Sequence, residues 1–200
     1  MAVWQMRSNQ AGFSAVELMV AVSIIIVVTV VSVLMFTTLS TNAHLNTAVQ
    51  TTASQIRMAR QSAMDRRMLY SVTFTPPGTI VTQRLLQGQA PITERTVTLP
   101  SDTQFIAPVG LPGAGKTPDQ FGSGTNAIDF DQAAGGGGNV LFFYPDGTAL
   151  DAAGDPNDGV IYIAHPGNLN SSHAITLWGA TGRLKTFYLT KTVAGGLKWE

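Results

Sequence analysis

Hydrophobic and polar positions divide the chain into three stretches with different periods. The first stretch is almost uninterruptedly apolar: after Glu17 the next charged side chain is Arg57, and residues 18–36 contain only three hydroxyl side chains among hydrophobic ones. About 20 apolar residues suffice for a helix to cross a bilayer. We therefore predict a transmembrane helix over Phe13 to Phe36, within a membrane part of the stem that covers residues 13–40.

The second stretch, residues 41–68, has a helical period. Apolar side chains recur every three or four residues and would form one face of an amphipathic helix; they are Leu45, Val49, Ala53, Ile56, Ala59 (or Arg60) and Ala63. No proline precedes Pro76, and no glycine lies between Gly12 and Gly78. We predict one helix from Phe13 to about Met68, roughly 80 Å long at ~1.5 Å per residue.

The third stretch, residues 69–200, alternates short β-rich runs with turn signals. The predicted strands are Leu69–Phe74, Thr79–Leu86, Thr93–Leu99, Asn126–Phe130, Val140–Tyr144, Val160–Ala164, Ala174–Trp178 and Leu184–Thr190. Between them, Val109–Gly124 is expected to be an exposed loop and Gly135–Gly138 a hairpin tip. The fold class is therefore α+β, a long N-terminal helix packed on an antiparallel sheet that forms a globular head.

Glu17 is the chemically conspicuous residue of the apolar stretch. A charge one turn inside a membrane helix costs roughly 2.5–3.5 kcal/mol on insertion scales, so such a residue usually has a partner. A plainer alternative is a snorkelling carboxylate at the membrane edge of an ordinary single-pass anchor. A secretory signal peptide fits less well, because its apolar region is short and its cleavage site follows that region.

The segment from Gly12-Phe13 to Glu17, heading an apolar helix, resembles the processing site of type IV prepilins and type II secretion pseudopilins. The resemblance implies a leader over residues 1–12, which prepilin peptidase would remove by cutting between Gly12 and Phe13. The new amine would be methylated, giving N-methylphenylalanine at Phe13, and Glu17 would attract that amine in the neighbouring subunit during assembly. It also implies a bacterial inner-membrane protein with a cytoplasmic N-terminus and a periplasmic head. Its partners would be other pilins or pseudopilins and the inner-membrane assembly platform.

A second resemblance is to the H-type minor pseudopilins. It rests on Ala59-Arg60-Gln-Ser-Ala63 before the first strand, on Leu141-Phe-Phe-Tyr-Pro-Asp-Gly147, and on Thr181-Gly182-Arg183 before the last predicted strand. Many type IV pilins carry a proline where this chain has Leu34, which favours an accessory subunit over a major one.

Composition narrows the possible functions of the head. From Tyr70 onward there are seven basic and ten acidic side chains, so the head is mildly acidic and no nucleic-acid partner is expected. A DNA- or ligand-capturing pilin stays an alternative, because Arg183, Lys185, Lys191 and Lys198 could form a local basic patch. The absence of cysteine excludes disulfides, thiolate metal sites and a cysteine nucleophile.

Three further patterns suggest chemistry, and each has a plainer explanation. Residues 110–117 match the P-loop pattern, which would make the chain a membrane-anchored nucleotide-binding protein. However, Pro118 and the glycines at 122 and 124 oppose the helix that such a loop needs. Four turn aspartates are weak calcium candidates, since aspartate also favours turns for its own hydrogen bonds; they are Asp146, Asp151, Asp155 and Asp158. The histidines at 44, 165 and 173 show no metal spacing, and no triad or cofactor site is apparent, so we expect no enzymatic activity.

Overall fold

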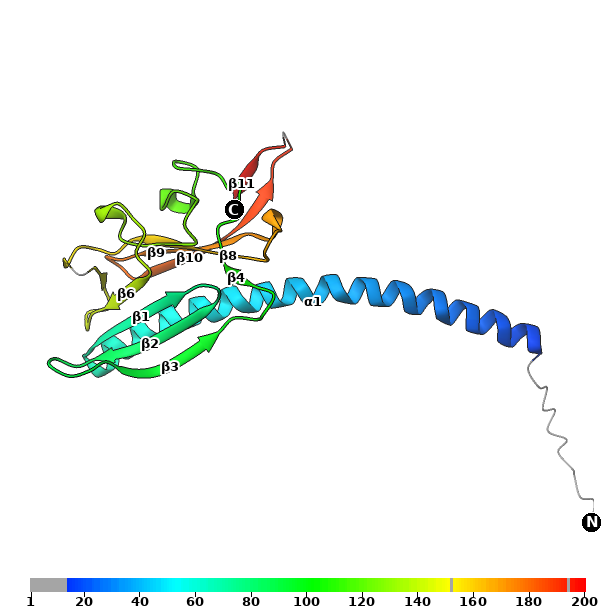
Figure 1. Cartoon of the computed structure of the whole chain (residues 1–200), viewed down its shortest axis with the longest axis horizontal. Helices are drawn as coiled ribbons and strands as arrows, with labels where there is room; N and C mark the ends of the chain where they lie inside the picture. The colour runs from blue at the N-terminus through cyan, green and yellow to red at the C-terminus, as the bar shows by residue number, and fades with distance from the viewer. Residues whose placement is uncertain (1–13, 152, 194) are drawn as a thin grey trace, which may run out of the picture. The chain divides into compact units, whose positions relative to one another are not determined.

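The computed structural model describes residues 14–151, 153–193 and 195–200, apart from the side chains of residues 33–39 and 133. The chain divides into two compact units at residues 41 and 42, and each is described by itself. Helix α1 (Ala15–Arg66) contributes residues to both units, and its colour in Figure 1 runs from blue to cyan. The prediction of one helix is therefore confirmed over its described residues, whereas Gly12 and Phe13 lie outside them.

Helix α1 ends through a backbone signal at Arg67. This residue has a left-handed backbone conformation (φ 53°), and the next amide, of Met68, donates to the carbonyl oxygen of Ala63 at 3.2 Å. A left-handed residue followed by this bond is the usual way to satisfy the last carbonyls of a helix. It turns the chain directly into the first strand.

Two antiparallel sheets follow, rather than the single sheet expected. In the first sheet the strand order is β3 (Ile92–Thr98), β2 (Thr79–Leu85), β1 (Leu69–Thr75), β6 (Val140–Phe143) and β7 (Ala149–Leu150). In the second it is β11 (Leu197–Trp199), β10 (Arg183–Lys191), β9 (His173–Trp178), β8 (Gly159–Ala164) and β4 (Gln104–Phe105), with β5 (Ile128–Asp129) also paired to β8. The described part of the head also contains three single turns of 3₁₀-helix: η1 (Pro118–Gln120), η2 (Gln132–Ala134) and η3 (Leu169–Ser171).

The main core lies between the second half of α1 and both sheets. Every apolar residue of the predicted helical stripe is buried, with Ala59 rather than Arg60 on the stripe. These residues form one cluster with side chains of both sheets, including Tyr70, Phe74 and Ile161. Figure 1 shows the cyan turns of α1 running beside β1, β2 and β3 and alongside β8, β9 and β10. The helix is therefore a structural layer of the head.

The second sheet has a smaller core on its other face. Strand β8 is buried at all six positions: Ile161 and Ile163 belong to the main core, whereas Val160 and Tyr162 face the opposite side. There the segment of residues 106–124 covers the sheet. The prediction that Val109–Gly124 is an exposed loop is therefore wrong in part, because Thr117 and Pro118 are buried.

All eight predicted strands are present, with bounds that differ by one or two residues for seven of them. The eighth, predicted over Asn126–Phe130, is only the two-residue β5. The prediction missed β4, β7 and β11, which have two or three residues each and show no readable alternation. Gly135–Gly138 closes a loop that a bridge between Phe130 and Gly138 holds together, in agreement with the hairpin tip expected there.

Candidate functional site

The described chain begins at Ser14, directly before the first turn of α1. The Ser14 carbonyl accepts from the amide of Leu18 at 3.1 Å, and its hydroxyl accepts from that of Val16 at 3.3 Å. Glu17 lies in this first turn and is exposed. A carboxylate at that place interacts favourably with the positive end of the helix dipole. The sequence thus supplies a start signal for α1 immediately after the predicted cleavage position.

The first half of α1 presents apolar side chains on all sides. Residues 15–32 are long and apolar enough to cross a membrane, and none of them is buried within the chain. The large apolar side chains between Val16 and Val31 are 47–71% exposed. A helix that is hydrophobic all round requires an apolar environment such as a bilayer or other helices. The predicted transmembrane segment therefore has the right character over its described part.

Three hydroxyl side chains interrupt this apolar surface, and each is satisfied within the helix. Ser23 donates to the carbonyl oxygen of Met19 at 2.8 Å, Thr29 to that of Ile25 at 2.7 Å, and Ser32 to that of Val28 at 2.8 Å. Hydroxyls bonded to the preceding turn can enter hydrocarbon without an unpaired donor. Glu17 is then the only described polar side chain of residues 15–32 that finds no such internal partner.

Arg60 brings together the three motifs that suggested an H-type minor pseudopilin. From α1 its Nε donates to the carbonyl oxygen of Gly147 at 2.8 Å, and its Nη2 donates to that of Thr181 at 2.9 Å. Both turns have a positive-φ glycine next to the guanidinium, at Gly147 and Gly182, and a Cβ at Gly182 would overlap the arginine side chain. The three motifs thus meet at the Arg60 side chain, which joins the stem to one turn of each sheet.

The weak calcium candidates are used as turn residues. Asp146 accepts from the amide and hydroxyl of Thr148, Asp151 accepts from the amides of Ala153 and Asp155, and Asp158 accepts from the amide of Gly179. The described residues contain no group of three acidic or histidine side chains placed to hold a metal ion. The carboxylates of Asp146, Asp151 and Asp158 thus act as hydrogen-bond acceptors for backbone amides.

Residues 110–117 do not have the surroundings of a P-loop. The preceding strand, β4, has two residues and is antiparallel to β8, and the loop leads into the three-residue η1. A phosphate cradle needs a parallel strand before it and a true helix after it. Residues 110–117 therefore lack the strand–loop–helix geometry on which the nucleotide-binding alternative depends.

The predicted C-terminal basic patch is partly neutralised. Lys185 donates to Asp119 at 2.5 Å, and Lys198 lies 3.9 Å from Glu200. Asp119 also accepts from the hydroxyl of Thr176 (2.7 Å) and the indole N–H of Trp178 (3.2 Å). Burial raises the pKa of Asp119, but these bonds, that of Lys185 first, outweigh it and hold the pKa below its usual value. Sequence reasoning missed Asp119, because nothing in the local pattern marks it as buried.

The histidines contact the head rather than one another. His44 of α1 lies 3.0 Å from Asp102, and His165 Nδ1 lies 2.5 Å from the Asp102 carbonyl oxygen. Burial would raise the pKa of the Asp102 carboxyl, but the hydrogen bond with His44, a backbone hydrogen bond and the charge interactions with His44 and His165 together outweigh it and lower that pKa. His44 therefore contacts the loop before β4, an arrangement its position on the stem alone did not predict.

No protein-family model matches the chain, and no curated protein matches it significantly in sequence. Among solved structures, it is similar to the type IV minor pilin FimU of Pseudomonas aeruginosa, at 14% identity over 70% of this chain and 86% of that one, with a TM-score of 0.47. It is also similar to the minor pseudopilin EpsH from the type 2 secretion system of Vibrio cholerae, at 12% identity over 72% of this chain and 97% of that one, with a TM-score of 0.48. A second crystal form of FimU gives 14% identity, 70% and 90% coverage, and a TM-score of 0.46. These likenesses concern the course of the backbone alone.

Proposed function

We propose that this chain is a minor subunit of a type IV pilus or a type II secretion pseudopilus, and that it acts by assembly rather than by catalysis. The observation that carries the proposal is Glu17, which stands alone as a charge in the first turn of an exposed apolar helix, five positions after Gly12. In an ordinary membrane anchor a carboxylate at this place gains only its interaction with the helix dipole and has no cationic partner.

Electrostatics explains why the carboxylate would favour a filament. In a lone subunit within the bilayer, Glu17 pays a desolvation cost of a few kcal/mol without a cationic partner. If cleavage after Gly12 creates a new amine at Phe13, the amine of one subunit can meet the Glu17 of its neighbour. A desolvated charge pair with good geometry offsets the cost that an unpaired charge cannot. Assembly thus removes a penalty that the monomer bears.

The rest of the stem suits lateral packing. Its hydroxyls are bonded internally, and its exposed side chains over residues 15–32 are otherwise apolar. Such a helix can pass from lipid to a bundle of like helices without exposing a new polar group. We propose that prepilin peptidase and the inner-membrane assembly platform handle the chain in the bacterial inner membrane, with the head in the periplasm.

The first experiment is the intact mass and N-terminal sequence of the protein purified from its native membrane. The proposal predicts a chain that starts at Phe13 and carries one methyl group on its amine. A Gly12→Leu variant should keep the leader, whereas an Ala11→Ser variant should still be cleaved. A wild-type chain that starts at Met1 would refute the processing pathway and leave a plain single-pass anchor.

A second experiment separates assembly from processing. Glu17→Ala and Glu17→Gln should both be cleaved and methylated, yet both should be depleted from sheared filaments, because neither carries the charge that meets the neighbouring amine. Ser23→Ala serves as the matched stem control, since its hydroxyl is already bonded within the helix. Normal incorporation of Glu17→Gln would contradict the charge pairing.

A further inference from the structure

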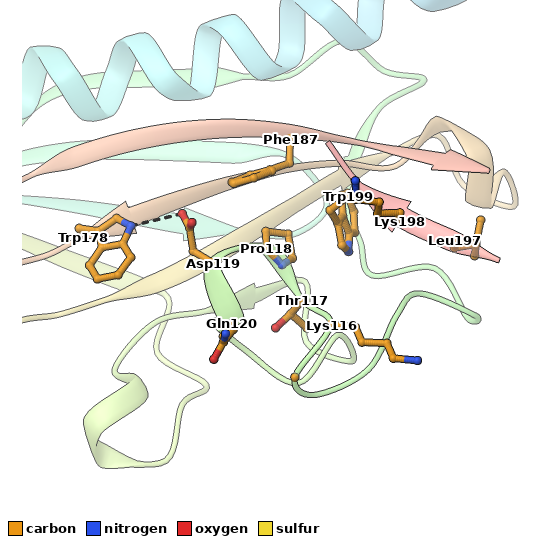
Figure 2. A pocket seen from close by; sticks show the side chains of 11 residues that line it. Lys116, Thr117, Pro118, Asp119, Gln120, Trp178, Phe187, Leu197, Lys198 and Trp199 are labelled. Carbon is orange, nitrogen blue, oxygen red and sulfur yellow. Dashed lines mark hydrogen bonds between the residues drawn. The ribbon is translucent and has the colours of Figure 1, made fainter. Parts of the chain in front are cut away.

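A pocket of about 720 Å³ lies on the outer face of the second sheet, between residues 115–120 and strands β9, β10 and β11. Figure 2 shows its wall of Trp178, Phe187 and Trp199 on the strands, facing the loop that carries Thr117 and Lys116. Pockets of roughly 300–1,000 Å³ with aromatic walls and a few polar groups are typical of small-molecule sites.

The loop side of the pocket is held in a strained conformation. Asp119 and Gln120 both have positive φ values, 50° and 64°, which residues other than glycine rarely adopt. The bonds from Lys185, Thr176 and Trp178 to the Asp119 carboxylate fix this turn to β9 and β10. Strain of this kind persists only where the surroundings enforce it, and it is found preferentially at functional sites. The pocket wall is thus preorganised.

Two buried polar groups of the pocket lack a hydrogen-bond partner among the described residues. They are the hydroxyl of Thr117, a residue only 6% exposed, and the indole N–H of Trp199, which is 8% exposed. A buried donor or acceptor without a partner costs about 1–3 kcal/mol. The indole can only donate, whereas a threonine hydroxyl can donate and accept. A ligand hydroxyl could accept a hydrogen bond from the indole N–H of Trp199 and form another with the hydroxyl of Thr117.

Charge and shape narrow the class of ligand. The Asp119 carboxylate is neutralised by Lys185, so the remaining charges at the pocket are the exposed cations Lys116 and Lys198, the latter loosely paired with Glu200 at 3.9 Å. The rim therefore favours an anion. Hydroxyl partners, partly exposed aromatic walls and a cationic rim together fit a sugar ring that bears a carboxylate.

A nucleic-acid base fits the same walls less well. Stacking of a base needs an open aromatic face. Here Trp178 packs against Phe121 with ring centroids 4.9 Å apart, and Trp199 packs against Tyr162 at 5.6 Å. Trp178 is 38% exposed and Trp199 only 8%, so the free ring surface is mainly that of Trp178, which is enough for contact with the C–H groups of a sugar. We propose that the head binds acidic saccharides in this pocket, independently of how the stem assembles.

The test is calorimetric titration of the full chain, in a detergent without a sugar headgroup, with tetragalacturonate as the probe. Cellotetraose is the neutral control and a dT20 oligonucleotide the nucleic-acid control. We expect tetragalacturonate to bind at least about tenfold more tightly than cellotetraose, which corresponds to ~1.4 kcal/mol. Equal binding of the two would overturn the acidic class, and binding of dT20 alone would overturn the saccharide class.

Two conservative variants test the pocket itself. Thr117→Val keeps the shape and removes the hydroxyl, and Trp199→Phe keeps an aromatic ring against Tyr162 and removes the N–H. Each should weaken tetragalacturonate binding by about tenfold. Lys191→Gln changes a β10 lysine outside the pocket lining and should leave binding unchanged apart from a small effect of net charge.

Stability separates a lost contact from a lost fold. Thr117→Val should leave the melting temperature equal or higher, because it removes an unpaired buried hydroxyl. Loss of binding in a variant that is no less stable would support the site. If tetragalacturonate does not bind, or if it binds equally to wild type and both variants, the proposal is wrong, whereas the processing and assembly assays above would be unaffected.

Discussion

Arg60 offers the sharpest test of how the stem and the head are joined. Its guanidinium is half-buried and donates to one turn of each sheet, at Gly147 and Thr181. A hydrogen bond from a charged group contributes about 1.5–3 kcal/mol, and the bond to Thr181 is exposed and therefore worth less. Arg60→Ala should thus lower the free energy of unfolding by about 3 kcal/mol. For a chain of this size that corresponds to a fall of about 6–12 °C in melting temperature.

Arg57→Ala is the matched control, because Arg57 lies on the same helix, carries the same charge and is exposed. Both variants are compared by thermal unfolding of the full chain in detergent, followed by the near-ultraviolet circular dichroism of the head tryptophans. We expect a large fall in melting temperature for Arg60→Ala and little change in it for Arg57→Ala. Equal effects of the two substitutions would refute a specific role for the two carbonyl contacts.

A double-mutant cycle extends the same test to the glycine beside the guanidinium. Gly182 has a φ of 63°, and a Cβ there would lie 2.8 Å from Cδ of Arg60. Gly182→Ala should therefore cost more in the wild type, where it displaces the arginine, than in Arg60→Ala, where only the backbone strain remains. We expect a coupling free energy of about 1 kcal/mol or more. Additive effects would show that Arg60 does not occupy that space.

Three further predictions concern the core and two half-buried aspartates. Ile56→Ala, at a side chain 1% exposed, should cost about 2–5 kcal/mol, whereas Met58→Ala, 44% exposed, should cost little in the same thermal unfolding assay. Burial raises the pKa of Asp131, which makes its charge unfavourable at neutral pH; Asp131→Asn should therefore raise the melting temperature at pH 7, with a smaller gain near pH 4. The depressed pKa of Asp119 means that its pairing with Lys185 stabilises the fold above about pH 4 and is lost as the pH falls further; Asp119→Asn should flatten the acid limb of stability against pH.

The helix and the long strands could be predicted because their buried side chains recur at the spacing of a helix or of a strand. The apolar stripe from Leu45 to Ala63 lies on one helical face, and it is buried as expected. Strand β1 alternates in the same way, with Tyr70, Val72 and Phe74 in the core. Local pattern and tertiary environment agree at these positions, so local pattern is enough.

The division into two sheets and the geometry of the pocket could not be predicted. Strands β4, β7 and β11 are too short to show a period, and β11 exists through its pairing with β10. The left-handed conformation of Asp119 depends on bonds to side chains of β9 and β10, far along the chain. Tertiary contacts decide these features, and residue type alone does not encode them.

Arg60 shows an intermediate case. The three motifs around it were recognisable as short patterns, but the pattern gave no reason for them to occur together. The structure supplies that reason, because one side chain bonds two turns that belong to different sheets. A residue just beside a hydrophobic stripe can therefore matter as much as those on it.

The shared layer of α1 has a consequence for biogenesis. The helix enters the core early in the chain, yet its apolar stripe belongs to the same buried cluster as Ile175 and Leu177 of β9, and Arg60 meets a partner 121 residues later. Contacts of such long range form late in folding. If the head is exported to the periplasm as proposed above, the stripe stays uncovered until nearly the whole chain has crossed the membrane. We expect the emerging polypeptide to need a holding chaperone, and truncations before β9 to aggregate rather than fold.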